Sequence, residues 1–128
     1  VLARIAADPT VCVLPFQYNE LSEKSTVVVE ACPSSTLKRL GLPHQCYKQS
    51  GGKPPEPVHR KTRRVILNWL GEQVDISRHR RRVIMQDPGG DALDAVLAAV
   101  GAWQGFSRAD HSAIACHDRF PIEGRVFC

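Results

Sequence analysis

The chain has 128 residues, of which 43% are hydrophobic, and a formal net charge of +4. This composition excludes a disordered chain, and the length suits one domain with a real core rather than two ordinary domains. No apolar run reaches the roughly 18 residues that a membrane span needs, and the opening VLARIAADPT has no apolar stretch typical of a signal peptide. We therefore expect a single domain over residues 1–128 with no membrane contact.

The five cysteines, at positions 12, 32, 46, 116 and 128, are widely scattered and form no CxxC motif. With His44 and His117 they do not fall at the spacings of structural zinc sites. We interpret them as reduced thiols of a cytoplasmic protein. A zinc site assembled from distant residues by the fold is the alternative.

Positive charge is concentrated between Arg60 and Arg82. This stretch holds eight of the seventeen Lys and Arg residues and only two acids, Glu72 and Asp75. Such an asymmetry indicates an anionic partner. The alternative interpretation is a basic surface that only contacts solvent.

The first half of the chain predicts two strands and a short helix. Residues 11–16 are expected to form a short strand, and the β-branched run at 26–30 a central strand covered on both faces. Ser34 and Ser35 are suitable N-caps for a helix over residues 36–40, which Gly41 would end. Residues 44–57 are rich in Gly, Pro and Lys and are expected to form a loop.

The second half predicts two longer helices and a last strand. Residues 60–70 form a helix with Val65, Ile66, Trp69 and Leu70 on its apolar side, ended by Gly71. Residues 74–86 are ambiguous, because their end fits either a strand or a basic helix. After the break at residues 88–90, a helix over 91–103 is apolar all round, which predicts burial on most sides, and Gly105 is expected to end it. Residues 123–128 are expected to form a final strand.

Three acids are the strongest candidates for chemistry. Asp91 and Asp94 lie one turn apart at the start of the predicted helix, so their carboxylates share one side. The alternative role is capping and a favourable interaction with the helix dipole. Glu30 directly follows an apolar strand, where functional groups gather in α/β proteins. Oxygen ligands of this kind suit Mg²⁺ or Mn²⁺; for Glu30 the alternative is a salt bridge with an arginine.

Five blocks of the sequence resemble, in order, an uncharacterised family of predicted nucleases with an RNase H-like fold. The segment VVEACPSSTLKRLGLP at 28–43 is similar to that family's "EvYPaatlr.lGlp" block, and CYK at 46–48 to its "YK" step. RRVIL at 63–67 resembles its "R..iL" helix, DALDAVLAA at 91–99 its "DalDAvvaA" helix, and EGRVF at 123–127 its "EGwiy" strand. Cys32 stands where the family usually has tyrosine.

The resemblance implies an RNase H-like mixed sheet flanked by helices. It also implies an essential aspartate on the first strand, which this chain does not contain, so the N-terminal strands of the fold are expected to be absent from it. Glu30, Asp91 and Asp94 would be the catalytic and metal-binding acids of a site for Mg²⁺ or Mn²⁺, incomplete in this chain. Lys48, Arg63 and Arg64 would hold the phosphates of a nucleic-acid substrate.

Two other classes of function compete with a metal-dependent nuclease. One is a non-catalytic module that binds nucleic acid through the basic region between Arg60 and Arg82, with the acids acting as caps. The other is a structural or interaction domain that has kept the fold and lost the chemistry, which the absent aspartate favours. RNase H-like folds host several activities, so the fold alone does not decide among them.

Overall fold

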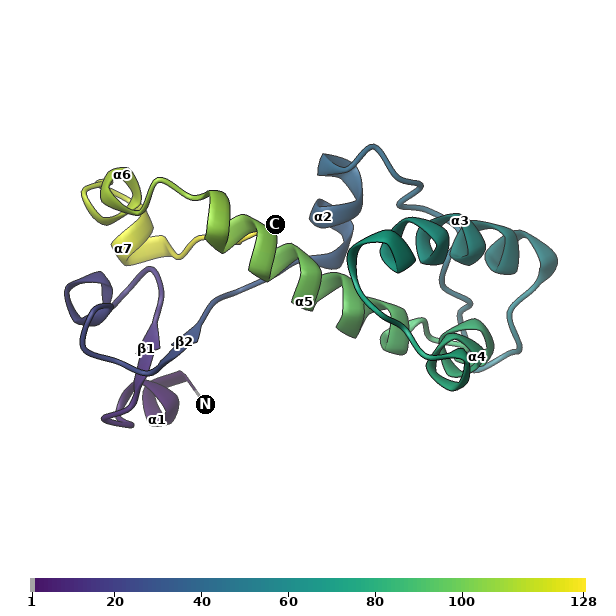
Figure 1. The fold of residues 1–128 in the computed structure, drawn as a ribbon, viewed down its shortest axis with the longest axis horizontal. Helices are drawn as coiled ribbons and strands as arrows, with labels where there is room; N and C mark the ends of the chain where they lie inside the picture. The colour runs from purple at the N-terminus through teal and green to yellow at the C-terminus, as the bar shows by residue number, and fades with distance from the viewer. Residues whose placement is uncertain (1) are drawn as a thin grey trace. The chain divides into compact units, whose positions relative to one another are not determined.

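The computed structural model describes residues 2–128 and has a mixed α/β fold in which helices predominate (Figure 1). Where we expected one domain, the chain forms two compact units. The first unit contains residues 2–31 and 102–128, and the second contains residues 32–101. Helix α5 (Asp91–Arg108) supplies residues to both of them.

The first unit combines a small sheet with short helices. Its elements are α1 (Leu2–Ala6), β1 (Val11–Val13), the 3₁₀ helix η1 (Tyr18–Glu20), β2 (Thr26–Val28), the end of α5, α6 (His111–Ala115) and α7 (Phe120–Glu123). β1 and β2 are parallel, with Val11 opposite Thr26 and Val13 opposite Val28. Cys12, Leu14, Ile114 and Phe127 form its buried core.

The predicted strand at 11–16 is therefore confirmed in its first half, whereas the two other strand predictions need correction. β2 is exposed along most of its length rather than covered on both faces, because β1 is the one strand that pairs with it among the described residues. The expected final strand at 123–128 is reduced to a single parallel bridge between Val126 and Glu30, and its first residue ends α7.

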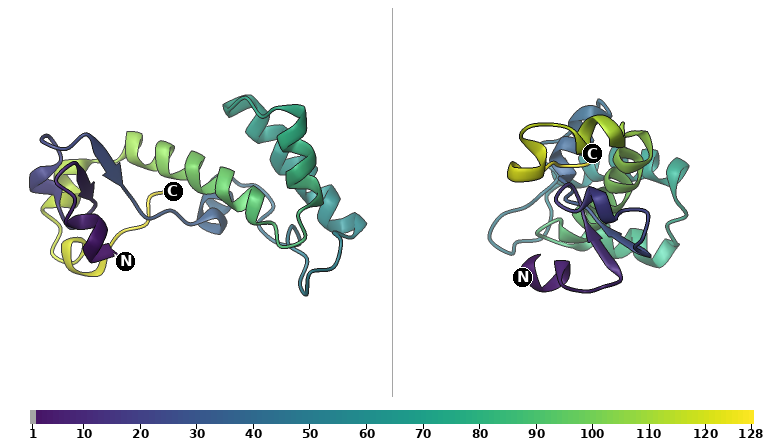
Figure 2. Two further views of the ribbon diagram at one scale, coloured as in Figure 1. Left: turned by 90° about the horizontal axis from the view of Figure 1, so that it is seen from below. Right: turned by 90° about the vertical axis from the view of Figure 1, so that its left-hand side faces the viewer.

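The second unit is helical and has the larger core. Its elements are α2 (Pro33–Arg39), α3 (Pro57–Gln73), α4 (Arg78–Gln86) and the first part of α5. α3 and α4 pack beside each other (Figure 2). The buried core of this unit consists of Leu37, Tyr47, Ile66, Leu67, Leu70, Ile84, Leu93, Leu97 and Val100.

The helix predictions hold for the existence of each helix, but several of the predicted ends are wrong. The N-cap of α2 is Cys32, so Ser34 and Ser35 lie inside the helix rather than before it. Gly71 lies within α3, which continues to Gln73. Gly105 lies within α5, where its missing side chain lets the backbone at Phe127 and Cys128 approach closely.

The ambiguous stretch at 74–86 contains the helix α4, with Ser77 as its N-cap: the side chain of Ser77 accepts from the backbone N–H of Arg80 at 3.3 Å. α5 differs from the prediction of burial on most sides. Leu93, Leu97 and Val100 are buried, whereas the first residue and two alanines one turn apart, Ala95 and Ala99, are exposed. α5 is therefore amphipathic, and its exposed residues also include Trp103, at 62%.

Candidate functional site

The predicted site residues are divided between the two units. Glu30 belongs to the first unit, and Lys48, Arg63, Arg64, Asp91 and Asp94 belong to the second. The side chain of Glu30 is exposed. Glu30 lines an apolar cavity of about 230 Å³ in the first unit, and the backbone carbonyl of Glu30 accepts from the N–H of Phe127 at 2.8 Å.

Both aspartates lie at the start of α5, as expected, with Asp91 exposed and Asp94 partly exposed. The capping role considered as the alternative for Asp91 is filled by Asp87, whose carboxylate accepts from the N–H of Ala92 at 2.8 Å. Asp87 lies four residues before the first residue of α5, so its side chain can accept from an N–H at the helix N-terminus that has no partner within the helix. No hydrogen bond between the carboxylate of Asp91 and a helix N–H is found among the described residues.

Asp94 lies in a hydrogen-bonded cluster with Tyr47 and Lys48. The hydroxyl of Tyr47 donates to Oδ1 of Asp94 at 2.9 Å, and the ammonium of Lys48 forms an ion pair with Oδ2. The same ammonium lies 5.6 Å from the centroid of the Tyr47 ring. Both carboxylate oxygens of Asp94 therefore already have a donor, so a metal ion would compete with Lys48 for this ligand.

Tyr47 is buried, with 5% of its surface exposed. Burial raises the pKa of its hydroxyl well above the ordinary value, and the hydrogen bond and negative charge of Asp94 raise it further. The hydroxyl therefore stays protonated at neutral pH and acts as a donor to Asp94. This arrangement makes Tyr47 part of the core of the second unit.

Arg63 is fully buried, with 0% of its surface exposed. Its Nε donates to the carbonyl of Tyr47 at 2.6 Å, and its terminal nitrogens donate to four carbonyls around the end of α4. These are Ile84 at 3.0 Å, Met85 at 3.5 Å, Asp87 at 2.5 Å and Pro88 at 3.2 Å. Burial lowers the pKa of the guanidinium. The prediction that Arg63 holds phosphates is wrong for this structure, because the backbone occupies its donors.

Gly90 closes the segment between α4 and α5. Its φ is +80°, a left-handed conformation that favours glycine. A Cβ atom at this position would lie 3.0 Å from Cγ of Lys48, 3.6 Å from Nη2 of Arg63 and 3.7 Å from Cδ2 of Tyr47. The break predicted at residues 88–90 is thus also the place where the backbone passes close to the cluster around Asp94.

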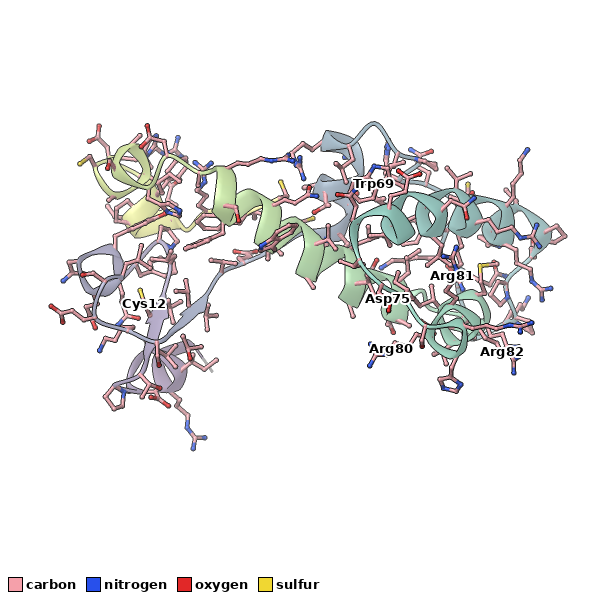
Figure 3. The ribbon with its side chains drawn as sticks, in the orientation of Figure 1. Cys12, Trp69, Asp75, Arg80, Arg81 and Arg82 are labelled. Atoms are coloured by element: carbon pink, nitrogen blue, oxygen red, sulfur yellow. The ribbon has the colours of Figure 1, made fainter. Side chains whose placement is uncertain are left out.

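A basic surface of the second unit lies on α4. Arg78, Arg80 and Arg82 are exposed, and the first turn of the helix holds no acid. Arg81 is directed toward α3, where it donates to the side chain of Asn68 at 3.2 Å; Figure 3 shows Arg80 and Arg82 on the outer side of the helix. Arg64, on α3, is exposed as its predicted role requires.

The second unit also carries most of the positive charge of the chain. Residues 32–101 contain twelve of the seventeen Lys and Arg residues and six of the thirteen Asp and Glu residues, a net formal charge of +6. The remaining five basic and seven acidic residues give the other unit a net charge of −2. The basic character therefore belongs to the helical unit alone.

Residues 2–128 contain no group of three or more His, Cys, Asp or Glu side chains that could hold a metal ion. The site for Mg²⁺ or Mn²⁺ formed by Glu30, Asp91 and Asp94 stays a prediction. All five cysteines are free thiols. Among the described helices, none has the length and apolar character that crossing a bilayer requires.

Comparisons with models of protein families, with curated proteins and with solved structures found no match to this chain.

Proposed function

We propose that the helical unit binds nucleic acid through the basic surface of α4, with Arg64 as a further phosphate contact. The observation that carries this proposal is the placement of Arg78, Arg80 and Arg82, which are exposed at the start of a helix. Among residues 2–128, no ion pair joins any of these three arginines to an acid.

The electrostatics of this helix support an anionic partner. The N-terminus of a helix carries a partial positive charge, so cations there are unfavourable by a few tenths of a kcal/mol each. α4 begins with Arg-His-Arg-Arg-Arg and has no acid in its first turn. Several like charges at this end repel one another and the helix dipole, and the phosphates of a nucleic acid would relieve both effects.

Binding of wild-type chain to labelled double-stranded DNA, single-stranded DNA and single-stranded RNA tests the proposal. Binding of at least one of these should weaken steeply as salt is added, because counterions are released from the phosphates. Binding should also survive EDTA, since no described metal site takes part. Absence of binding to all three at low salt would contradict the proposal.

A second candidate is the metal-dependent phosphodiester hydrolysis that the resemblance to the predicted RNase H-like nucleases implies. Its support is the position of Asp91 and Asp94, exposed and partly exposed at the start of α5. The resemblance implies Glu30 as a third acid and a role for Mg²⁺ or Mn²⁺ in activating the attacking water. In this reading Lys48 leaves Asp94 when the metal binds, and the protein works in the reducing cytoplasm.

A thermal shift with Mn²⁺ separates the two candidates. The nuclease candidate predicts that Mn²⁺ raises the melting temperature of a protein that also contains the family's first-strand aspartate. Asp94→Asn should abolish the increase. No shift with Mn²⁺ or Mg²⁺ in such a chain would rule out the nuclease and leave nucleic-acid binding standing.

A further inference from the structure

Among residues 2–128, the backbone groups on the outer edge of β2 have no hydrogen-bond partner. The N–H of Thr26 donates to the carbonyl of Thr10 at 3.1 Å, and the carbonyl of Val28 accepts from the N–H of Leu14 at 3.0 Å. Both residues therefore direct their backbone toward β1. Because successive residues of a strand direct these groups to opposite sides, Val27 and Val29 direct theirs away from β1. The carbonyl of Ser25 does the same, because it belongs to the peptide whose N–H, that of Thr26, donates toward β1.

Nothing in the described part of the chain satisfies this edge. Within residues 2–128, no hydrogen bond involves the backbone N–H or carbonyl of Val27 or Val29. The side chain of Val27 is also exposed, at 37%, and β1 is the one element with which β2 makes extensive contact. An uncharged edge of β-branched residues is a template for pairing with another strand.

We propose that this edge pairs with β2 of a second copy of the chain, antiparallel and centred on Val27. A two-fold axis then places Val27 opposite Val27 of the second copy, and Ser25 opposite Val29. These are the residues whose N–H and carbonyl groups point outward, so each of these pairs is a hydrogen-bonded one. The result is a sheet with two parallel pairs joined by an antiparallel centre, a mixed arrangement that is common.

Charge complementarity selects a second copy as the occupant. The same register places Lys24 of one chain directly opposite Glu30 of the other, at both ends of the paired segment. Among the described residues no ion pair involves Glu30, whose side chain is exposed. Two N–H groups of Lys24 bind Glu20 at 3.0 Å and the carbonyl of Pro9 at 3.0 Å, and the proposed dimer assigns the third to Glu30 of the second copy. Opposite charges directly across antiparallel strands stabilise the pair.

Sedimentation velocity of the 128-residue chain over a range of concentrations tests this dimer. The wild-type chain should show a reversible monomer–dimer equilibrium. Val27→Lys places two like charges opposite each other at the axis and should raise the dimer dissociation constant roughly tenfold or more. Glu30→Lys should also weaken the dimer, and added salt should reduce that effect because it screens the repulsion between Lys24 and the introduced lysine.

Ile122→Lys is the matched control, because Ile122 belongs to the same unit and is 80% exposed. It should leave the dissociation constant unchanged. Circular dichroism and thermal unfolding check that each variant folds, and Glu30→Lys, at an exposed position, carries the test if Val27→Lys unfolds. A wild-type chain that stays monomeric at its highest soluble concentration would overturn the proposal. A dimer dissociation constant that neither Glu30→Lys nor a folded Val27→Lys changes would also overturn the proposal.

Discussion

Arg63 donates through Nη1 to the backbone carbonyl of Asp87 at 2.5 Å, while the carboxylate of Asp87 accepts from the N–H of Ala92 at 2.8 Å. The two residues thus connect α3 with the end of α4 and the start of α5. A buried guanidinium is favourable only where its donors are satisfied, and here backbone carbonyls do so. Arg63 therefore fixes the backbone that positions Asp94.

Replacing Arg63 by methionine should destabilise the protein strongly. Methionine fills part of the space but leaves buried carbonyls without a donor, each of which costs about 1–3 kcal/mol. We expect a loss of about 3 kcal/mol in the free energy of unfolding, measured by urea denaturation. The neighbouring Arg64→Met, at an exposed position, is the control and should change stability by less than about 0.5 kcal/mol. Equal effects of the two substitutions would contradict the role assigned to Arg63.

Gly90→Ala should destabilise the protein for two separable reasons. The left-handed backbone at φ +80° costs an alanine about 1–2 kcal/mol, and the new Cβ would also meet Cγ of Lys48 at 3.0 Å. Gly52→Ala isolates the first reason, since Gly52 has φ +69° and no atom lies within 4 Å of the point that its new Cβ would occupy. Thermal unfolding should therefore rank Gly90→Ala as the more harmful substitution; the opposite order would exclude close packing at Gly90.

Tyr47 should make stability depend on pH in the alkaline range. Because burial and Asp94 raise the pKa of its hydroxyl above the ordinary value of 10.0, the folded state holds its proton more tightly than the unfolded state. The resulting contribution of Tyr47 to the free energy of unfolding is fully present below about pH 10 and is lost as pH rises above this value. Tyr47→Phe should lower stability by about 1 kcal/mol at neutral pH through the lost hydrogen bond.

Comparing the free energy of unfolding of the wild-type chain and of Tyr47→Phe between about pH 9 and pH 11 isolates the effect of the Tyr47 hydroxyl. The free energy of unfolding of the wild-type chain should fall more steeply with pH than that of Tyr47→Phe, so that their difference narrows. Tyr18, whose pKa burial also raises, is present in both proteins and cancels. If the free energies of unfolding of the two proteins changed in parallel with pH, the hydroxyl of Tyr47 would have the same pKa in the folded and unfolded states, and the prediction would be wrong.

The helix α3 illustrates how much of the fold could be predicted. Its apolar periodicity predicted the helix, but the buried stripe is Arg63, Ile66, Leu67 and Leu70, at the spacing i, i+3, i+4 and i+7. Arg63 is in phase with this stripe, which was the available signal for its burial. The positive charge of Arg63 suggested a phosphate contact instead. The carbonyls that accept its hydrogen bonds belong to residues about twenty positions further along the chain, so the local sequence did not reveal them.

The acids and β2 show where sequence patterns are insufficient. The position of Asp91 and Asp94 at the start of a helix followed from the local pattern, whereas the pairing of Asp94 with Tyr47 and Lys48 depends on a loop more than forty residues earlier. The β-branched run at 26–30 predicted a strand, and its first three residues form β2. Its burial could not be predicted, since that depends on which elements pair with the strand rather than on the strand itself.

The salt dependence of nucleic-acid binding by a variant of α4 tests whether the arginines of this helix bind phosphates. Replacing Arg78, Arg80 and Arg82 together by alanine should weaken binding and reduce the slope of log affinity against log salt by about 2 to 3, if each arginine neutralises one phosphate. The matched control replaces Arg4, Arg108 and Arg119, three exposed arginines of the other unit, and should leave the slope unchanged. The same slope in the α4 variant and the wild-type chain would contradict nucleic-acid binding by α4.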